Sequence, residues 1–90
     1  MSLKKLNEDY RIVVLDRGNV LVGQFEQLEE GCVLRNASVI RRWGTSKGLG
    51  ELVKNGPLPN TILDECNGVV RFREAAVLFT IDTEANKWIK

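Results

Sequence analysis

Histidine is absent from this chain of 90 residues, and cysteine and proline occur only twice each. Without histidine, a nucleophilic serine or cysteine would need a lysine or a carboxylate as its base, and no spacing in the sequence pairs such groups convincingly. Two cysteines that lie far apart in the sequence do not supply the four ligands of a zinc site. The residues therefore predict a protein with no catalytic site, no metal site and no cofactor.

Long hydrophobic runs are also missing. The sequence has no run of about eighteen apolar residues and no basic-then-apolar leader, so it predicts neither a membrane span nor a secretory signal. We therefore expect a cytoplasmic protein without a membrane partner. In that compartment Cys32 and Cys66 should be reduced and should pack as small hydrophobic residues.

A strong net charge is the third absence, since the formal charge is only +1. Recognition of a charged ligand would then depend on a local group of side chains. The length fits one domain, and we assign residues 1–9 to an N-terminal arm and 10–90 to a single domain with a helical insertion at 41–60. A domain this small buries only about 60 to 65% of its unfolded surface, which favours stabilisation by self-association or by a ligand.

Short segments rich in β-branched and aromatic residues predict five to six strands. These segments are 11–15, 20–30, 32–43, 61–65, 69–72 and 75–81. Gly18 and Asn19 can supply the positive φ angles of a tight hairpin between the first two strands. Asn67-Gly68 is a similar hairpin signal between the fourth and fifth strands.

Two irregularities predict bends within strands. Gly23 interrupts a segment in which Leu21, Phe25 or their neighbours should lie on a buried face, and a glycine at such a place is typical of a bulge or sharp bend. The third strand should be broken or kinked near 36–38. Small barrels need bends of this kind to close, so we expect a mainly β, strongly bent small barrel.

A short helix of about two turns is predicted within the insertion. Thr45 or Ser46 can cap its start, and Gly56-Pro57 can end it. Its buried face would consist of Leu49, Leu52 and Val53. A second short helix is predicted at 84–90, capped by Asp82 or Thr83, where Trp88 and Ile89 would dock on the domain.

The segment RIVVLDRGNVLVGQFEQLEEGCVLRNAS resembles the first motif of the Sm-like family, a hydrophobic strand, a basic-glycine turn and an apolar strand containing a glycine. Arg17-Gly18, Val20, Gly23 and Phe25 fall at the places of that motif. VVRFREAAVLF resembles the family's second motif more weakly. The resemblance implies an Sm-like or SH3-like barrel and association through edge strands.

The RNA pocket of the Sm-like family is not implied. That family holds a base through an aspartate and an asparagine in the loop after the second strand, where this chain has only the turn 29–31. Arg73 matches the arginine of the second motif, but Glu74 stands where the family has glycine.

Most of the chain is similar to a family of small phage, prophage and bacterial proteins that have no assigned activity. The resemblance rests on GNVLVGQFEQLEEGCVLRNAS, on GTSKGLGEL and on TEANKWI, together with the asparagine-alanine step at 36–37 and the basic-aromatic run at 41–43. It implies a phage accessory protein, which would act in the host cytoplasm.

Positive charge gathers between Arg35 and Lys54, where five cations accompany only one acid, Glu51. If Ser46 caps the helix, Lys47 and nearby amides would lie at its positive end and favour a phosphate. Trp43 could stack on a base. The predicted ligand-binding residues are Arg41, Arg42, Trp43, Ser46 and Lys47. In the alternative interpretation, Trp43 plugs one end of the barrel and the arginines are a solvated edge.

These features predict a non-enzymatic binding module that forms a homo-oligomer and captures an anionic ligand, either a nucleotide or a strand of RNA or DNA. Two alternatives stay open. One is an inhibitor that docks on a host enzyme through the helix face or a strand edge. The other is a structural component of a virion or of its assembly.

Overall fold

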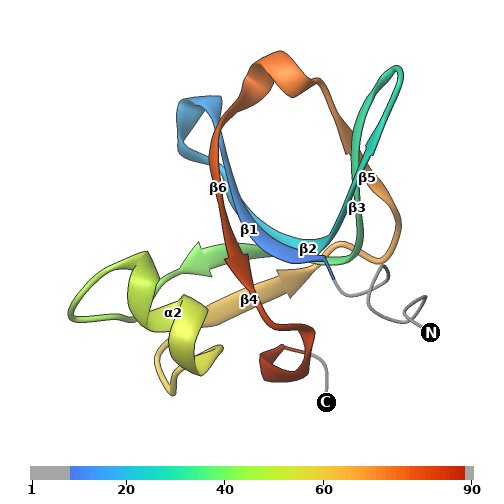
Figure 1. Cartoon of the computed structure of the whole chain (residues 1–90). Coiled ribbons are helices and arrows are strands. Elements are labelled where there is room, and N and C mark those ends of the chain that lie inside the picture. The colour runs from blue at the N-terminus through green and yellow to red at the C-terminus, as the bar shows by residue number, and fades with distance from the viewer. Residues whose placement is uncertain (1–8, 89–90) are drawn as a thin grey trace.

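The computed structural model describes residues 9–88, which form one antiparallel sheet and one α-helix (Figure 1). The strands are β1 (Tyr10–Leu15), β2 (Val20–Leu28), β3 (Gly31–Arg42), β4 (Ile62–Glu65), β5 (Val70–Phe72) and β6 (Val77–Thr83). The helix is α2 (Leu49–Asn55), and the single 3-10 turns are η1 (Asp16–Gly18), η2 (Glu74–Ala76) and η3 (Ala85–Lys87). The predictions of a mainly β fold and of one inserted helix are confirmed.

The sheet curls strongly, but its hydrogen bonding does not close in the part of the chain that the structure describes. The strand order is β4-β3-β2-β1-β6, with β5 also paired to β3. Figure 1 shows β6 and β5 on opposite sides of the curl, with α2 and β4 beyond one end of it. Within residues 9–88 no pairing joins β6 to β4 or β5, so closure into a barrel is not confirmed.

The long strand β3 explains why the predicted hairpin at Asn67-Gly68 is wrong. Asn67 does have a positive φ of 59°, as a turn there requires. However, β4 and β5 each pair with β3 instead of with each other. β4 pairs with residues 38–42 and β5 with residues 32–34. A bent strand of twelve residues has room for both short strands along one edge.

The connection between β1 and β2 differs from the expected two-residue turn. Gly18 has a positive φ of 82°, as predicted, but Asn19 has a φ of −74°. Arg17 takes the second positive φ instead, at 65°. The reason is the 3-10 turn η1, which places the left-handed residues one position earlier in the chain.

β1 is buried on both faces, which accounts for its continuous apolar run 12–15. Ile12 and Val14 belong to one buried cluster, which Leu52 of α2 also joins. Val13 belongs to a second cluster with Leu21 and Leu34, on the other side of the strand. Ile12, Val13 and Leu52 are all 0% exposed. β1 is therefore the wall that the two clusters share.

Leu21 and Phe25 both lie at the second cluster, which confirms the prediction of a buried face. The predicted kink of β3 is confirmed as well. The pairing of β2 with β3 shifts register between Val22 and Gln24, and Asn36 takes a positive φ of 53°. A Cβ atom on Gly23 would lie 3.0 Å from the Ala37 Cα, so the glycine permits this bend.

The predicted helix is confirmed, but its cap is not the predicted one. Gly48 occupies the N-cap position, and no side chain bonds there. Thr45 does accept a hydrogen bond, from the Gly48 N–H to its Oγ1 at 3.1 Å, one residue before the helix begins. Leu49 and Val53 pack beside Leu52, so packing holds this short helix in place.

The predicted C-terminal helix is reduced to the single turn η3, and Thr83 belongs to β6 instead of capping it. The Thr83 hydroxyl donates to the Val53 carbonyl oxygen at 2.9 Å and accepts from Trp88 Nε1 at 3.1 Å. Trp88 packs on the first buried cluster, as predicted. Ile89 lies outside the described residues.

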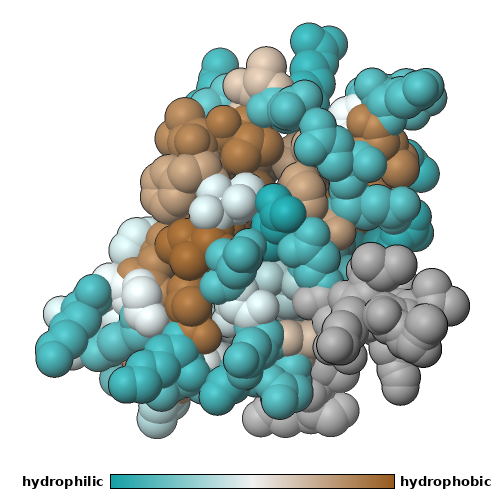
Figure 2. Space-filling view, in the orientation of Figure 1, coloured by the Kyte–Doolittle hydropathy of each residue, from teal (hydrophilic) through white to brown (hydrophobic). Residues whose placement is uncertain are grey.

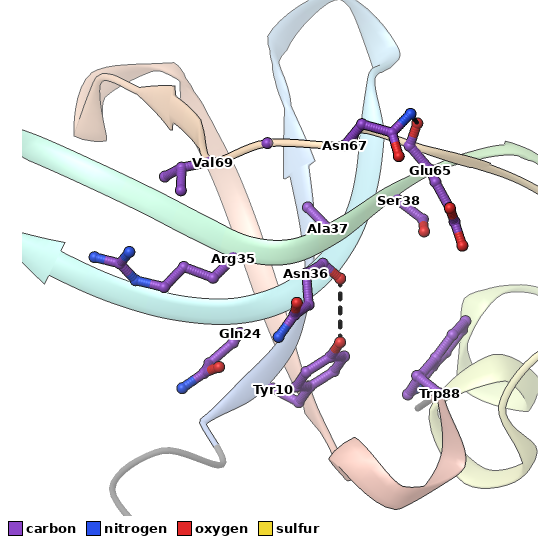
Figure 3. A pocket seen from close by; sticks show the side chains of 11 residues that line it. Tyr10, Gln24, Arg35, Asn36, Ala37, Ser38, Glu65, Asn67, Val69 and Trp88 are labelled. Carbon is purple, nitrogen blue, oxygen red and sulfur yellow. Dashed lines mark hydrogen bonds between the residues drawn. The ribbon is translucent and has the colours of Figure 1, made fainter. Parts of the chain in front are cut away.

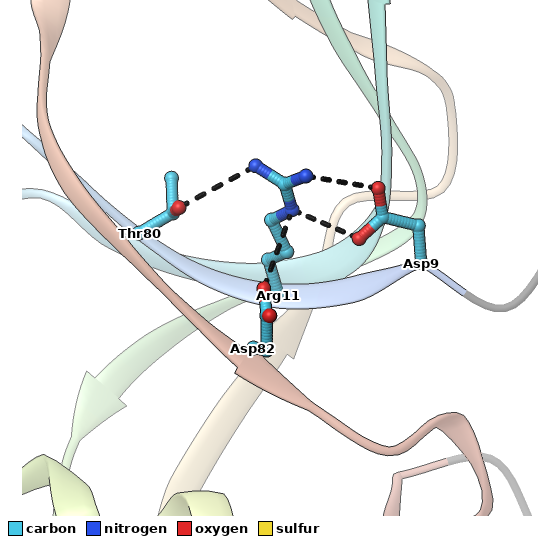
Figure 4. Close-up of polar contacts among 4 residues, drawn as sticks. All are labelled: Asp9, Arg11, Thr80 and Asp82. Carbon is cyan, nitrogen blue, oxygen red and sulfur yellow. Dashed lines mark hydrogen bonds and ion pairs between the residues drawn. The ribbon is translucent and has the colours of Figure 1, made fainter.

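Most of the predicted arm, residues 1–8, also lies outside the described part of the chain. Asp9 accepts two hydrogen bonds from the Arg11 guanidinium, at 2.8 and 3.0 Å (Figure 4). The guanidinium also lies over the Phe25 ring, 4.2 Å from its centroid. The bond to Asp9 raises the pKa of Arg11 above its ordinary value, so this cation is fixed at the start of β1.

Cys32 is buried and Cys66 is half-buried, and both are free thiols, as predicted. Burial raises the pKa of the Cys32 thiol above its usual range. Among residues 9–88 no helix has the length and hydropathy to cross a bilayer.

Candidate ligand-binding site

The residues predicted to bind a ligand lie on the surface near the end of β3. Arg41 and Arg42 end the strand, at a register shift in its pairing with β4. Trp43 follows them, and Ser46 and Lys47 lie in the loop before α2. All five side chains are exposed, so the structure leaves them accessible.

Arg41 already has a close partner. Its Nε lies 2.7 Å from Asp64 Oδ2, and its NH2 nitrogen donates to Oδ1 at 3.3 Å. This bidentate bond raises the pKa of Arg41 above its ordinary value. A phosphate at Arg41 would have to compete with the carboxylate of Asp64.

Ser46 does not cap α2, which corrects the predicted geometry of the phosphate site. Its N–H and its hydroxyl each donate to the Glu51 carboxylate at 3.1 Å. The single acid of the basic segment therefore occupies the place where an anion was expected.

Trp43 is 40% exposed, which contradicts the alternative in which it plugs the end of a barrel. Its carbonyl oxygen accepts from Thr61 Oγ1 at 2.7 Å, and this bond ties the end of β3 to the segment before β4. The indole stays accessible on the surface, so its predicted use in stacking stays a prediction.

A concave surface lies at the bend of β3, and we call it the β3 concavity (Figure 3). Its volume is about 850 Å³, within the range of small-molecule sites. It is lined by Tyr10, Gln24, Arg35, Asn36, Ala37, Ser38, Glu65, Asn67, Gly68, Val69 and Trp88. Of the cations in the basic segment, only Arg35 reaches it.

The bend of β3 positions the polar side chains of the concavity. The left-handed residue Asn36 exposes its carbonyl oxygen to Tyr10, whose hydroxyl donates to it at 3.2 Å. Next along the strand, Ser38 is the direct partner of Glu65 in the pairing of β3 with β4. Paired residues of an antiparallel sheet project from the same face with Cβ atoms about 5 Å apart, so this hydroxyl and carboxylate are neighbours.

Arg35 is held more loosely than Arg41. Its guanidinium nitrogens lie 3.2 and 3.4 Å from Glu26 Oε1, longer than a strong charge-assisted hydrogen bond. The two side chains are 47% and 50% exposed. A pair of this kind contributes little to stability, so an anionic ligand can replace Glu26 at low cost.

Tyr10 places a phenol hydroxyl in a buried part of the lining of the β3 concavity. The residue is 3% exposed, and burial raises the pKa of its phenol above the ordinary value. The phenol therefore stays protonated at neutral pH and keeps donating to the Asn36 carbonyl.

The concavity combines several kinds of recognition. Arg35 can bind a phosphate or carboxylate, and Glu65 can accept from an amino or hydroxyl group. Gln24, Asn36 and Ser38 offer amide and hydroxyl groups. The Nε1–H of Trp88 is already bonded to Thr83, so the indole contributes to the concavity as an aromatic surface. Within residues 9–88 no three histidine, cysteine, aspartate or glutamate side chains are placed to hold a metal ion.

Two residues of this site carry a signal in the sequence, but that signal predicts only local structure. Asn36 belongs to the predicted kink and Asn67 to the predicted turn, and both have a positive φ. Only three non-glycine residues of the described chain share that backbone state, and these two line one concavity. Left-handed non-glycine residues gather at ligand sites more often than elsewhere.

Comparison with protein-family models, curated proteins and solved structures finds no match for this chain. The two resemblances drawn from its sequence therefore stay predictions.

Proposed function

We propose that this chain is a binding module for a small nucleotide and that the ligand occupies the β3 concavity. One observation carries the proposal. A volume of about 850 Å³ brings a weakly paired guanidinium, several amide and hydroxyl groups and an indole to one site. A nucleotide needs these groups, a cation for its phosphate, polar groups for its sugar and base edges, and a ring for stacking.

The choice between the concavity and the basic segment follows from charge pairing. Both Arg35 and Arg41 are exposed and both face a carboxylate, but the Arg41 contact is 2.7 Å and the Arg35 contact is 3.2 Å. Arg35 also lines the β3 concavity, whereas Arg41 does not. We therefore assign the phosphate to Arg35.

We also propose that the fold is a small barrel of the Sm-like or SH3-like kind. The curled sheet, its bend at Gly23 and the pairing of the last strand with the first support an Sm-like or SH3-like barrel whose closure is incomplete.

Titration calorimetry of the full chain with nucleoside monophosphates tests the proposal. Arg35→Ala should weaken binding at least tenfold, because a hydrogen-bonded charge pair is lost. Arg41→Ala is the matched control, since it removes another exposed, carboxylate-paired arginine and should leave affinity unchanged. Binding should also weaken as salt rises.

Two results would reject this assignment. If no monophosphate binds a folded sample, the chain is not a nucleotide module. If Arg41→Ala abolishes binding and Arg35→Ala does not, the ligand lies on the basic segment predicted from the sequence.

A further inference from the structure

The β3 concavity carries opposite charges at its two ends. In Figure 3, Arg35 and Gln24 lie toward one end of the site and Glu65 and Ser38 toward the other. Trp88 lies at the Glu65 end. A ligand with one phosphate can satisfy the charges of this site in only one orientation, because the carboxylate repels the phosphate.

The Glu65 end has a defined hydrogen-bonding pattern. Ser38 and Glu65 are direct cross-strand partners, so a hydroxyl and a carboxylate lie side by side. A carboxylate only accepts hydrogen bonds, whereas a hydroxyl can both donate and accept. The complementary ligand edge is therefore an amino group next to an unprotonated ring nitrogen.

Adenine and cytosine present that edge. Each has an exocyclic amino group, which would donate to Glu65, beside a ring nitrogen, which would accept from Ser38. Hypoxanthine and uracil instead carry a keto oxygen beside a ring N–H. With a phosphate at Arg35 and a base stacked on Trp88 in the same position as adenine or cytosine, that keto oxygen would face the carboxylate of Glu65 as a second acceptor. Rejection of these bases would come from two unpaired acceptors in contact, a repulsive form of specificity.

Resting on the proposed function, we propose that the β3 concavity selects adenine and cytosine nucleotides, with the phosphate at Arg35, the base stacked against Trp88 and the amino group at Glu65. Glu65 is the specificity-determining residue in this arrangement. Ser38 completes the contact to the base edge.

The test compares AMP with IMP and CMP with UMP on the full chain by titration calorimetry. The amino-bearing member of each pair should bind about tenfold more tightly. Glu65→Gln should remove that difference, because an amide can donate to a keto group, while affinity for AMP falls only modestly. Asp64→Asn is the matched control. It changes the adjacent carboxylate of β4, which bonds to Arg41 away from the concavity, and should preserve the preference.

The outcomes separate this inference from the proposed function. Equal binding of AMP and IMP, with Arg35 still required, would overturn base selection and leave the nucleotide site in place. A preference that survives Glu65→Gln would also overturn it. If no nucleotide binds, or if binding does not need Arg35, both the inference and the proposed function are rejected.

Discussion

At the scale of single residues, Tyr10 and Asn36 connect the start of the chain to the bend of β3. The phenol of Tyr10 is almost fully buried, and its hydrogen bond to the Asn36 carbonyl spans 26 residues of sequence. A buried hydroxyl without such a partner would cost about 1 to 3 kcal/mol, so the bond keeps the ring in the wall of the concavity. The shape of the site therefore depends on the protonated phenol.

This dependence predicts a loss of stability at alkaline pH. Since the folded pKa of Tyr10 is raised, the unfolded chain loses its phenolic proton at a lower pH than the folded chain. The contribution is fully present below pH of about 10 and decreases as pH rises through the folded pKa. In urea denaturation the difference in stability between wild type and Tyr10→Phe should be constant below pH of about 9 and shrink above about 10.

The chain has a single tyrosine, so the near-ultraviolet absorbance of the phenolate reports this residue directly. A phenol that titrates at the ordinary pKa in the folded protein would contradict the prediction. So would a stability difference that does not change with pH.

At the scale of elements, α2 and the turn η3 stabilise each other. Leu52 of the helix is 0% exposed, and Thr83 bonds both to the Val53 carbonyl and to Trp88. Gly56 ends the helix with a φ of 74° and donates from its N–H to the Leu52 carbonyl at 2.8 Å. A Cβ atom there would lie against the Lys87 carbonyl oxygen, closer than van der Waals contact allows. The end of the helix therefore packs closely against η3.

Two alanine substitutions in this region should therefore have opposite effects. Gly50→Ala, in the first turn of the helix with open space around it, should raise the free energy of unfolding by up to about 1 kcal/mol. Gly56→Ala should lower it by at least about 1 kcal/mol, because the residue has a positive φ and no room for a side chain. Chemical denaturation measures both. Equal effects of the two substitutions would contradict both the positive φ of Gly56 and its close contact with Lys87.

Elements were predicted well from the sequence because their signals are local. The glycine in β2, the apolar face of α2 and the β-branched run of β1 each lie within a few residues. Capping was predicted less well, since Glu51 bonds to Ser46 only once the loop has folded back on the helix. The separate pairing of β4 and β5 with β3 depends on the length and bend of a distant strand.

The candidate site was harder to predict for the same reason. Tyr10 and Trp88 are near opposite ends of the sequence, and they meet only because β6 pairs with β1. The basic segment around Arg41 is visible in the sequence because its cations lie close together along the chain. Whether a cation is already held by a carboxylate, as Arg41 is by Asp64, depends on tertiary structure.

At the scale of the whole molecule, one edge of the described sheet carries exposed hydrophobic side chains. β6 is the terminal strand on one side, and it carries Leu78 at 63% exposure and Phe79 at 51%. A register shift against β1 leaves Leu78 unpaired in that ladder. Figure 2 shows hydrophobic side chains gathered on the face where β6 runs. Exposed apolar side chains on an edge strand favour association with another chain.

We expect this edge to mediate the predicted self-association. Light scattering of the purified chain should give a mass above that of one copy, and Phe79→Lys should return it to the monomer mass, since a charge cannot be buried in the contact. Trp43→Lys, which replaces another exposed aromatic residue outside β6, is the control and should leave the mass unchanged. A wild-type monomer, or equal masses for wild type and Phe79→Lys, would contradict the expectation.

The double burial of β1 also determines how the domain opens. Because Ile12 and Val14 belong to one buried cluster and Val13 to the other, neither cluster can separate while β1 stays in place. The backbone amides of β1 should then exchange with solvent deuterium only when the entire domain unfolds. Amides of the seven-residue helix α2 have fewer buried neighbours and should exchange through brief local openings. The amides of β1 should therefore be the last to exchange, and their exchange rate measures the free energy of global unfolding.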